Sequence, residues 1–85
     1  MMGTRCGSID PAIVPFMMEK KGMTPQEADT VLNKQSGLLG ICGTSDMRDV
    51  HANIEKGDEK AALAFKMLTR SIKKVLGSYF FLLGN

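Results

Sequence analysis

The sequence predicts a mainly α-helical chain, with three to four helices and one glycine-rich turn or short strand between them. Apolar residues recur at helical spacing in several stretches, and residues that favour helix ends stand at the borders of those stretches. With 85 residues, the chain has room for only one small domain.

The first helix is predicted to begin at Asp10-Pro11, because Asp suits the N-cap and Pro suits the first helical position. Pro15 lacks a backbone N–H, so it should kink this helix or delay its start. Gly22 is the expected end of the helix. Residues 1–9 are expected to form an extended segment and a tight loop before it.

A capping box predicts the start of the second helix. The Thr24 hydroxyl can accept from the Glu27 amide, while the Glu27 side chain reaches back to the Thr24 amide. We expect this helix to stop near Ser36-Gly37. Residues 37–43, GLLGICG, are too rich in glycine for a stable helix interior, so they predict a buried turn or a short strand.

A third helix is predicted after this segment. Ser45 or Asp46 can cap it, and its inward-facing residues would be Met47, Val50 and Ile54.

The last helix is predicted to cover residues 59–83, with Asp58 as its N-cap. Unbroken, it would be about 37 Å long at roughly 1.5 Å per residue. A compact chain of this size has a radius of gyration of about 12 Å, and hence a diameter of roughly 30 Å, so the helix is longer than the body on which it should pack. Either the helix breaks at Gly77 or its apolar end needs a partner. The apolar face would consist of Ala61, Ala64, Phe65, Leu68, Ile72, Val75, Leu76, Tyr79, Phe80 and Leu83.

Charge and composition exclude several classes of protein. The formal net charge of +2 does not suggest the concentrated basic face of a nucleic-acid-binding protein. No apolar run is longer than that of residues 79–83, which is far shorter than the ~20 residues of a membrane span, and we recognise no secretory signal. Cys6 and Cys42 make no disulfide framework and cannot fill a zinc site with one histidine. We therefore expect a cytoplasmic protein with reduced thiols, no metal ligands, and no nucleic-acid or membrane partner.

Two polar segments are candidate binding sites. The Arg5 guanidinium lies among glycines that allow a phosphate or carboxylate to approach closely, or it is simply a surface arginine. Residues 45–49, SDMRD, stand at a predicted helix start, where exposed amides could hold an anion or a ribose or could simply be capped.

Other residues carry weaker signals. Residues 37–43 lack both the Walker ending and the GxGxxG spacing, which favours a structural turn over a phosphate loop. His51 has no metal-binding pattern around it and is expected in solvent. The basic residues of the last helix are expected to form a solvated face, with a membrane-surface role as the alternative; they are Lys66, Arg70, Lys73 and Lys74.

Three segments together resemble the acetokinase family, which comprises acetate, propionate and butyrate kinases, and acetate kinase most of all. They are residues 2–13 (MGTRCGSIDPAI), 33–40 (NKQSGLLG) and 45–49 (SDMRD), and the similarity continues down the last helix. The first of these strings is long and specific.

The resemblance implies that residues 1–85 are a single partial domain, a helical fragment of the C-terminal lobe of a longer, two-lobed enzyme. That lobe has an α/β, ribonuclease-H-like fold, shared with sugar kinases, Hsp70 and actin. The implied enzyme transfers a phosphoryl group between ATP and acetate, forming acetyl phosphate and ADP, with Mg²⁺. Its implied assembly is a homo-oligomer.

The resemblance also implies roles for four residues. Arg5 matches the arginine of the family's GTR motif, which stabilises the transferring phosphoryl group. Asp46, Met47 and Arg48 match the segment that contacts the adenosine of ATP. The turn between Gly43 and Asp46 is one residue shorter than the family's usual turn, and Met47 stands where an aromatic residue is common.

Several groups that the reaction needs have no counterpart in this sequence. They are the family's catalytic aspartate, its phosphate-stabilising histidines, its magnesium ligands and its acetate pocket. We therefore expect the 85-residue chain alone to be inactive. Two alternatives stay open: a structural helical module that self-associates, and a fragment of a propionate kinase.

Overall fold

The computed structural model describes residues 1–84, which form five helices joined by short turns. The helices are α1 (Ile13–Lys21), α2 (Pro25–Lys34), α3 (Gly37–Cys42), α4 (Met47–Glu55) and α5 (Glu59–Leu82). The mainly α-helical prediction is confirmed. There is one helix more than predicted, because the glycine-rich segment is itself helical.

Helix α1 begins later than its sequence signals suggest. Its first residue is Ile13, and the side chain of Asp10 instead accepts a hydrogen bond of 2.9 Å from the amide of Ala12, just before the helix. Pro15 is the third helical residue, so its missing N–H falls in the first turn, where no intrahelical partner exists. The prediction of a delayed start is therefore confirmed, and Gly22 ends the helix in the left-handed conformation with φ 65°.

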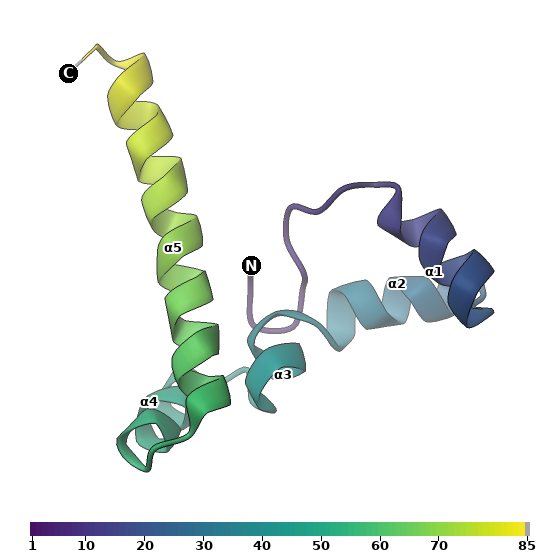
Figure 1. Cartoon of the computed structure of the whole chain (residues 1–85), viewed down its shortest axis with the longest axis horizontal. Coiled ribbons are helices and arrows are strands. Elements are labelled where there is room, and N and C mark those ends of the chain that lie inside the picture. Colours follow the sequence, from purple (N-terminus) through teal and green to yellow (C-terminus); the bar gives the residue numbers. More distant parts are fainter. Residues whose placement is uncertain (85) are drawn as a thin grey trace.

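Helix α2 has the predicted capping box. The Glu27 amide donates to the Thr24 hydroxyl at 3.1 Å, and the Thr24 amide donates to a Glu27 carboxylate oxygen at 3.4 Å. Helices α1 and α2 pack against one another and form one arm of the molecule, as Figure 1 shows.

Residues 37–42 form helix α3, which corrects the prediction of a turn or a short strand. Local propensity is overridden here by contacts with the N-terminal segment. The amides of Leu38 and Leu39, at the unsatisfied start of the helix, donate to the carbonyls of Met2 and Gly3, each at 2.9 Å. These tertiary hydrogen bonds stabilise a helix that its glycines disfavour.

The core lies where α5 crosses α3 and α4, at the lower end of the view in Figure 1. Val50 of α4 is its largest fully buried side chain, while Met47 and Ile54, also predicted to face inward, are half-buried. Of the two candidate caps of α4, Ser45 and Asp46, it is Asp46 that caps the helix, and Asp58 caps α5 as predicted. The buried apolar residues are Ala28, Leu38, Val50, Ala61 and Ala64.

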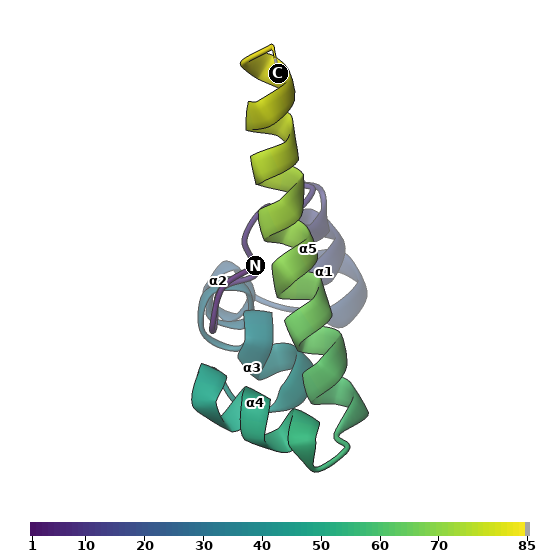
Figure 2. The same ribbon diagram turned by 90° about the vertical axis from the view of Figure 1, so that its left-hand side faces the viewer.

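Helix α5 continues unbroken through Gly77 to Leu82, so of the two predicted alternatives the break at Gly77 does not occur. Figures 1 and 2 both show its C-terminal half projecting beyond the other helices. The radius of gyration is accordingly 15.3 Å, larger than that expected of a compact chain. Of the predicted apolar face, only Ala61 and Ala64 are buried. Phe65 and Leu68 are half-buried, and the rest is exposed: Ile72, Val75, Leu76, Tyr79, Phe80 and Leu83.

Candidate functional site

The N-terminal segment carries the first candidate residue on a closely held loop, residues 2–6, which we call the Arg5 loop. The Met2 amide donates to the Arg5 carbonyl at 3.1 Å and closes the loop. The Cys6 amide donates to the Leu32 carbonyl at 2.9 Å, which ties the loop to the last turn of α2. The backbone on both sides of Arg5 is thus fixed by hydrogen bonds.

The end of α2 and its connection to α3 also hold this loop. The Ser36 amide donates to the Thr4 carbonyl at 2.9 Å, and the Thr4 hydroxyl donates to the Asn33 carbonyl at 3.1 Å. The Arg5 side chain is exposed and takes part in none of the side-chain hydrogen bonds or ion pairs found within residues 1–84. A free guanidinium on a fixed backbone is suited to binding an anion.

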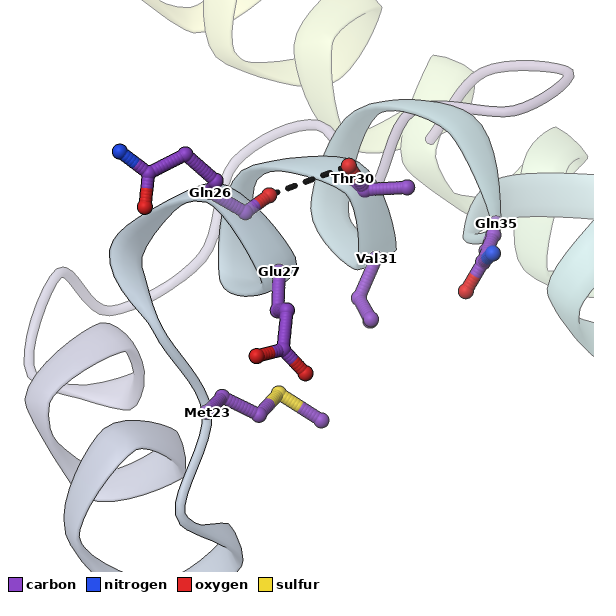
Figure 3. A pocket seen from close by; sticks show the side chains of 6 residues that line it. All are labelled: Met23, Gln26, Glu27, Thr30, Val31 and Gln35. Carbon is purple, nitrogen blue, oxygen red and sulfur yellow. Dashed lines mark hydrogen bonds between the residues drawn. The ribbon is translucent and has the colours of Figure 1, made fainter.

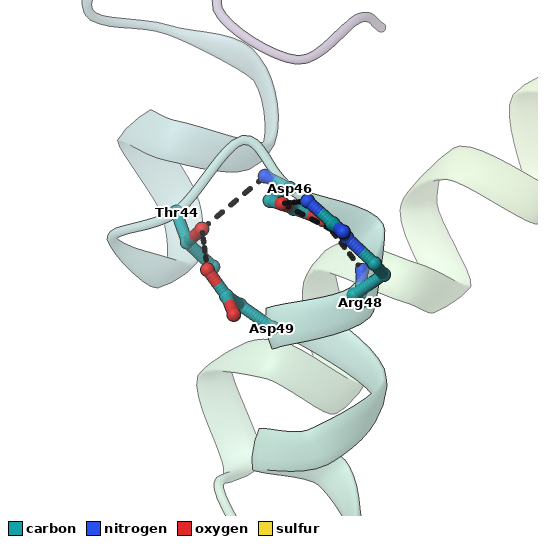
Figure 4. A network of polar contacts seen from close by, with 4 residues as sticks. All are labelled: Thr44, Asp46, Arg48 and Asp49. Carbon is teal, nitrogen blue, oxygen red and sulfur yellow. Dashed lines mark hydrogen bonds and ion pairs between the residues drawn. The ribbon is translucent and has the colours of Figure 1, made fainter.

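The second candidate segment forms a polar network at the start of α4, shown in Figure 4. Asp46 is the N-cap, and one of its carboxylate oxygens accepts the Arg48 amide at 2.8 Å. The Arg48 guanidinium donates to the other carboxylate oxygen at 2.7 Å. The Thr44 hydroxyl accepts from the Asp46 amide at 3.2 Å and donates to Asp49 at 3.2 Å.

The Asp46–Arg48 pair lies at the protein surface. The hydrogen bonds from the Arg48 side chain and amide lower the pKa of Asp46 from 3.8 to about 2, and the same pairing raises the pKa of Arg48. The Arg48 side chain is 91% exposed, so water and salt screen the attraction between the two charges. Asp46 is therefore ionised at neutral pH, and the guanidinium face remains open to a ligand.

The structure brings the two candidate segments together. A Cβ atom added to Gly3 would stand 3.3 Å from the Cβ of Ser45, which places the Arg5 loop beside the turn that leads into α4. Helix α3 lies between them in the sequence. The amides of its first turn donate to carbonyls of the Arg5 loop, and its C-cap is Gly43, shortly before Asp46.

Two residues of this arrangement were missed by the sequence reasoning. Thr44 links the Asp46 amide to Asp49, and a Thr shortly before a helix start is a recognisable signal for such a bond. Gly37 is buried against the Arg5 loop, and no local sequence signal identifies that contact.

The remaining sequence candidates lie elsewhere. His51 is exposed, as expected, and its ring lies 5.2 Å from that of Phe65, centroid to centroid. Cys6 and Cys42 are free thiols. Within residues 1–84, no three His, Cys, Asp or Glu side chains gather where they could hold a metal ion, so we assign none of these residues to Mg²⁺. No helix in the described part of the chain is long and apolar enough to cross a membrane.

Two hollows contain none of the predicted site residues. The first, of about 320 Å³, lies along α2 and is shown in Figure 3. Its Glu27 carboxylate already serves the capping box, and its Thr30 hydroxyl donates to the Gln26 carbonyl at 3.0 Å. The second, of about 510 Å³, separates the N-terminal segment from the exposed part of α5; its lining residues are Met1, Ser8, Ser71, Ile72, Lys74, Val75 and Leu76.

Comparison with known families identifies the family to which this arrangement of helices belongs. The family model described as the acetokinase family matches residues 1–85, the whole chain. The chain belongs to the acetokinase family. Every segment described above, from the Arg5 loop to the projecting end of α5, is therefore an acetokinase segment.

Individual acetokinases match along nearly the whole chain. The acetate kinase of Desulfovibrio desulfuricans is 76% identical over 83 residues, which are 98% of this chain and 21% of that protein. The acetate kinase of Oleidesulfovibrio alaskensis is 67% identical over 85 residues, again 21% of its length. The chain thus spans about a fifth of the length of these relatives, in agreement with the fragment expectation.

Solved acetokinase structures contain the same arrangement of helices. The crystal structure of Porphyromonas gingivalis acetate kinase matches with a TM-score of 0.93 and 41% identity over 100% of this chain and 22% of that one. A propionate kinase from Francisella tularensis matches with a TM-score of 0.93 and 43% identity, over 99% of this chain and 22% of that one.

Proposed function

We propose that this chain serves as part of an acetate kinase, in which it supplies a phosphoryl-binding arginine and an adenosine-binding turn. The identity of 76% to an acetate kinase carries the proposal. In the proposed reaction, an acetate oxygen attacks the γ-phosphorus of ATP, the bond to the β,γ-bridging oxygen breaks, and ADP leaves. Such an enzyme is expected in the cytoplasm.

Arg5 is the residue that we propose to stabilise the transferring phosphoryl group. Phosphoryl transfer passes through a loose transition state whose charge is spread over the equatorial oxygens, so positioned cations supply much of the catalysis. The Arg5 guanidinium is exposed and the backbone around it is held by hydrogen bonds, which suits a group that must be in place before the reaction.

The turn with Asp46, Met47 and Arg48 is proposed to contact the adenosine of ATP. Arg48 offers a planar, exposed guanidinium face, on which an aromatic base can stack. Asp46 holds that guanidinium in place and keeps its negative charge at neutral pH. The position of Gly3 against Ser45 would bring this turn and Arg5 to the same nucleotide.

The chain needs further polypeptide to complete the site. Magnesium would be bound by residues outside this chain, as the resemblance to the acetokinases implies. The exposed apolar end of α5 also calls for a partner, since soluble proteins seldom leave a large contiguous apolar patch uncovered. We therefore propose that the isolated chain makes no acetyl phosphate.

A second candidate function, a self-associating helical module, rests on that same exposed face. Leu76, Tyr79 and Phe80 are 62%, 59% and 59% exposed, and a second copy of the chain could cover them. Self-association would describe the isolated chain, and it is compatible with a catalytic role in a longer enzyme, itself proposed to be a homo-oligomer. The alternative is that the chain is part of a propionate kinase, with propionate in place of acetate as the substrate. Only the likeness to the Francisella tularensis structure favours it.

The test compares the isolated chain with a chimera, in which these residues replace the matching segment of the Desulfovibrio desulfuricans acetate kinase. Each is given ATP, Mg²⁺ and acetate, and acyl phosphate is trapped as the hydroxamate. The expected result is product from the chimera and none from the isolated chain. An inactive but folded chimera would contradict the proposed function, and product from the isolated chain would contradict the need for further polypeptide.

A further inference from the structure

We propose that Gly37 is a positioning residue for Arg5: its lack of a side chain lets the Arg5 loop lie directly on the α2–α3 connection, and this contact fixes where the guanidinium projects. The inference rests on the proposed function of Arg5. It assigns to the glycine at the start of α3 a role in turnover, in addition to its role in the fold.

The space around Gly37 carries the argument. Gly37 is buried, has φ +63°, and a Cβ atom added to it would stand 2.8 Å from the Arg5 carbonyl oxygen and closer still to the Met2 carbonyl oxygen. Both are backbone atoms, which cannot rotate away as a flexible side chain could. Any side chain at this position must therefore push the loop outward, in addition to straining its own backbone.

The hydrogen bonds that flank Arg5 transmit this contact to its side chain. The Thr4 carbonyl accepts the Ser36 amide and the Cys6 amide donates to the Leu32 carbonyl, each at 2.9 Å. These bonds hold the residues directly before and after Arg5. A displacement of about 1 Å at a reacting group can reduce turnover by about 100-fold, so a shift of this loop should be felt mainly in kcat.

The Thr4 hydroxyl provides a second, milder way to disturb the same contact. It donates to the carbonyl of Asn33 at 3.1 Å, in the last turn of α2, four residues before Gly37. Val has nearly the shape of Thr without the hydroxyl, whereas Ser keeps the hydroxyl. Thr4→Val should therefore loosen the loop without a steric clash, whereas Thr4→Ser should keep the hydrogen bond and the position of the loop.

Gly22 is the matched control for Gly37. Its φ of +65° gives the same left-handed strain to an alanine, but no atom lies within 4 Å of its added Cβ. In the 85-residue chain, Gly37→Ala should speed hydrogen exchange at the Cys6 and Leu38 amides by at least about tenfold, whereas Gly22→Ala should not. Equal exchange rates in the two variants would overturn the contact itself.

The link to turnover is tested in the chimera by a double-mutant cycle with Arg5→Ala. Gly37→Ala should lower kcat by about 100-fold with the KM for ATP within about twofold, and it should lower kcat by less than about threefold once Arg5 is already alanine. Gly22→Ala should leave kcat unchanged in both backgrounds. Equal losses in the two backgrounds would overturn the proposal, because Gly37 would then act independently of Arg5.

Two further outcomes also have a defined meaning: a Gly37→Ala variant that does not fold, and an Arg5→Ala variant with unchanged turnover. If Gly37→Ala prevents folding, Thr4→Val should still lower kcat by about fivefold, with recovery in Thr4→Ser, and no change in Thr4→Val would overturn the proposal. If Arg5→Ala alone leaves turnover unchanged, the proposed function of Arg5 fails, and the effect of Gly37 on turnover through Arg5 fails with it. The exchange experiment decides separately whether Gly37 holds the loop.

Discussion

Gly3 and Ser45 lie against one another, so that a Cβ atom on Gly3 would be only 3.3 Å from the Cβ of Ser45. This contact joins the loop that carries Arg5 to the turn that carries Asp46 and Arg48. The two candidate segments are far apart in the sequence, and helix α3 with its flanking turns brings them together. This contact suits a ligand that carries a phosphoryl group at one end and a base at the other.

The Asp46–Arg48 pair predicts an unusual titration. The Arg48 hydrogen bonds hold the Asp46 pKa at about 2, so NMR of the Asp46 carboxyl carbon should show a midpoint near that value. Because the folded-state pKa lies below the ordinary 3.8, the stability it contributes is present above pH 3.8 and is lost as the pH falls toward 2. In Arg48→Ala the midpoint should return toward 3.8, and an unchanged midpoint would contradict the pairing.

Val50 predicts the sensitivity of the small core. Its side chain is fully buried where α4 meets α5, so Val50→Ala should lower the free energy of unfolding by about 2 kcal/mol through lost burial and a residual cavity. Ala52→Gly on the exposed face of α4 is the control for helix propensity, expected to cost about 1 kcal/mol. Urea unfolding of the 85-residue chain measures both. A loss below that of the control would show that α4 and α5 do not pack as described.

The capping box predicts a separate, local effect. Thr24→Ala removes the acceptor for the Glu27 amide and should destabilise α2 by about 1 kcal/mol, while Thr24→Ser should keep most of the stability. Amide exchange along α2 measures the effect. If exchange at the Glu27 amide is the same in Thr24→Ala and Thr24→Ser, the hydroxyl does not cap this helix.

The exposed end of α5 predicts self-association of the isolated chain. Leu76 is 62% exposed, and its burial between two copies should contribute enough that Leu76→Glu weakens association by about tenfold or more. Ala52→Glu changes the charge equally on the exposed face of α4 and should have little effect. Light scattering over a concentration series measures both. A chain that stays monomeric at all concentrations would contradict self-association through this face.

Local signals predicted most of the helix boundaries. Asp46, Asp58 and the Thr24–Glu27 pair cap their helices as predicted, because each cap depends on residues at most three positions away. The glycine-rich α3 could not be predicted in the same way. Its first amides are satisfied by carbonyls of Met2 and Gly3, and no local rule identifies partners so distant in the sequence.

The candidate site shows the same division. Residue types alone indicate Arg5 and residues 45–49 as candidate binding sites, and the resemblance to the acetokinases supplies the specific roles of Arg5 and Asp46; the family match covers both residues. Their roles stay predictions. The contact of Gly37 with the Arg5 loop depends on a close approach of two backbone segments. The only sign of this approach in the sequence is the glycine itself, which does not identify its partner. Likewise, the sequence left open whether α5 breaks at Gly77 or runs through it, because one glycine disfavours a helix by only about 1 kcal/mol.

The most direct test of the central claim is Arg5→Ala in the chimera, compared with Arg70→Ala as the control for loss of an exposed arginine. If Arg5 stabilises the transferring phosphoryl group, its loss should lower kcat by about 100-fold to 1000-fold while the KM for ATP changes by less than about threefold. Arg70→Ala should leave both constants unchanged. Unchanged kcat in Arg5→Ala, or a rise in KM with no loss of kcat, would contradict the account.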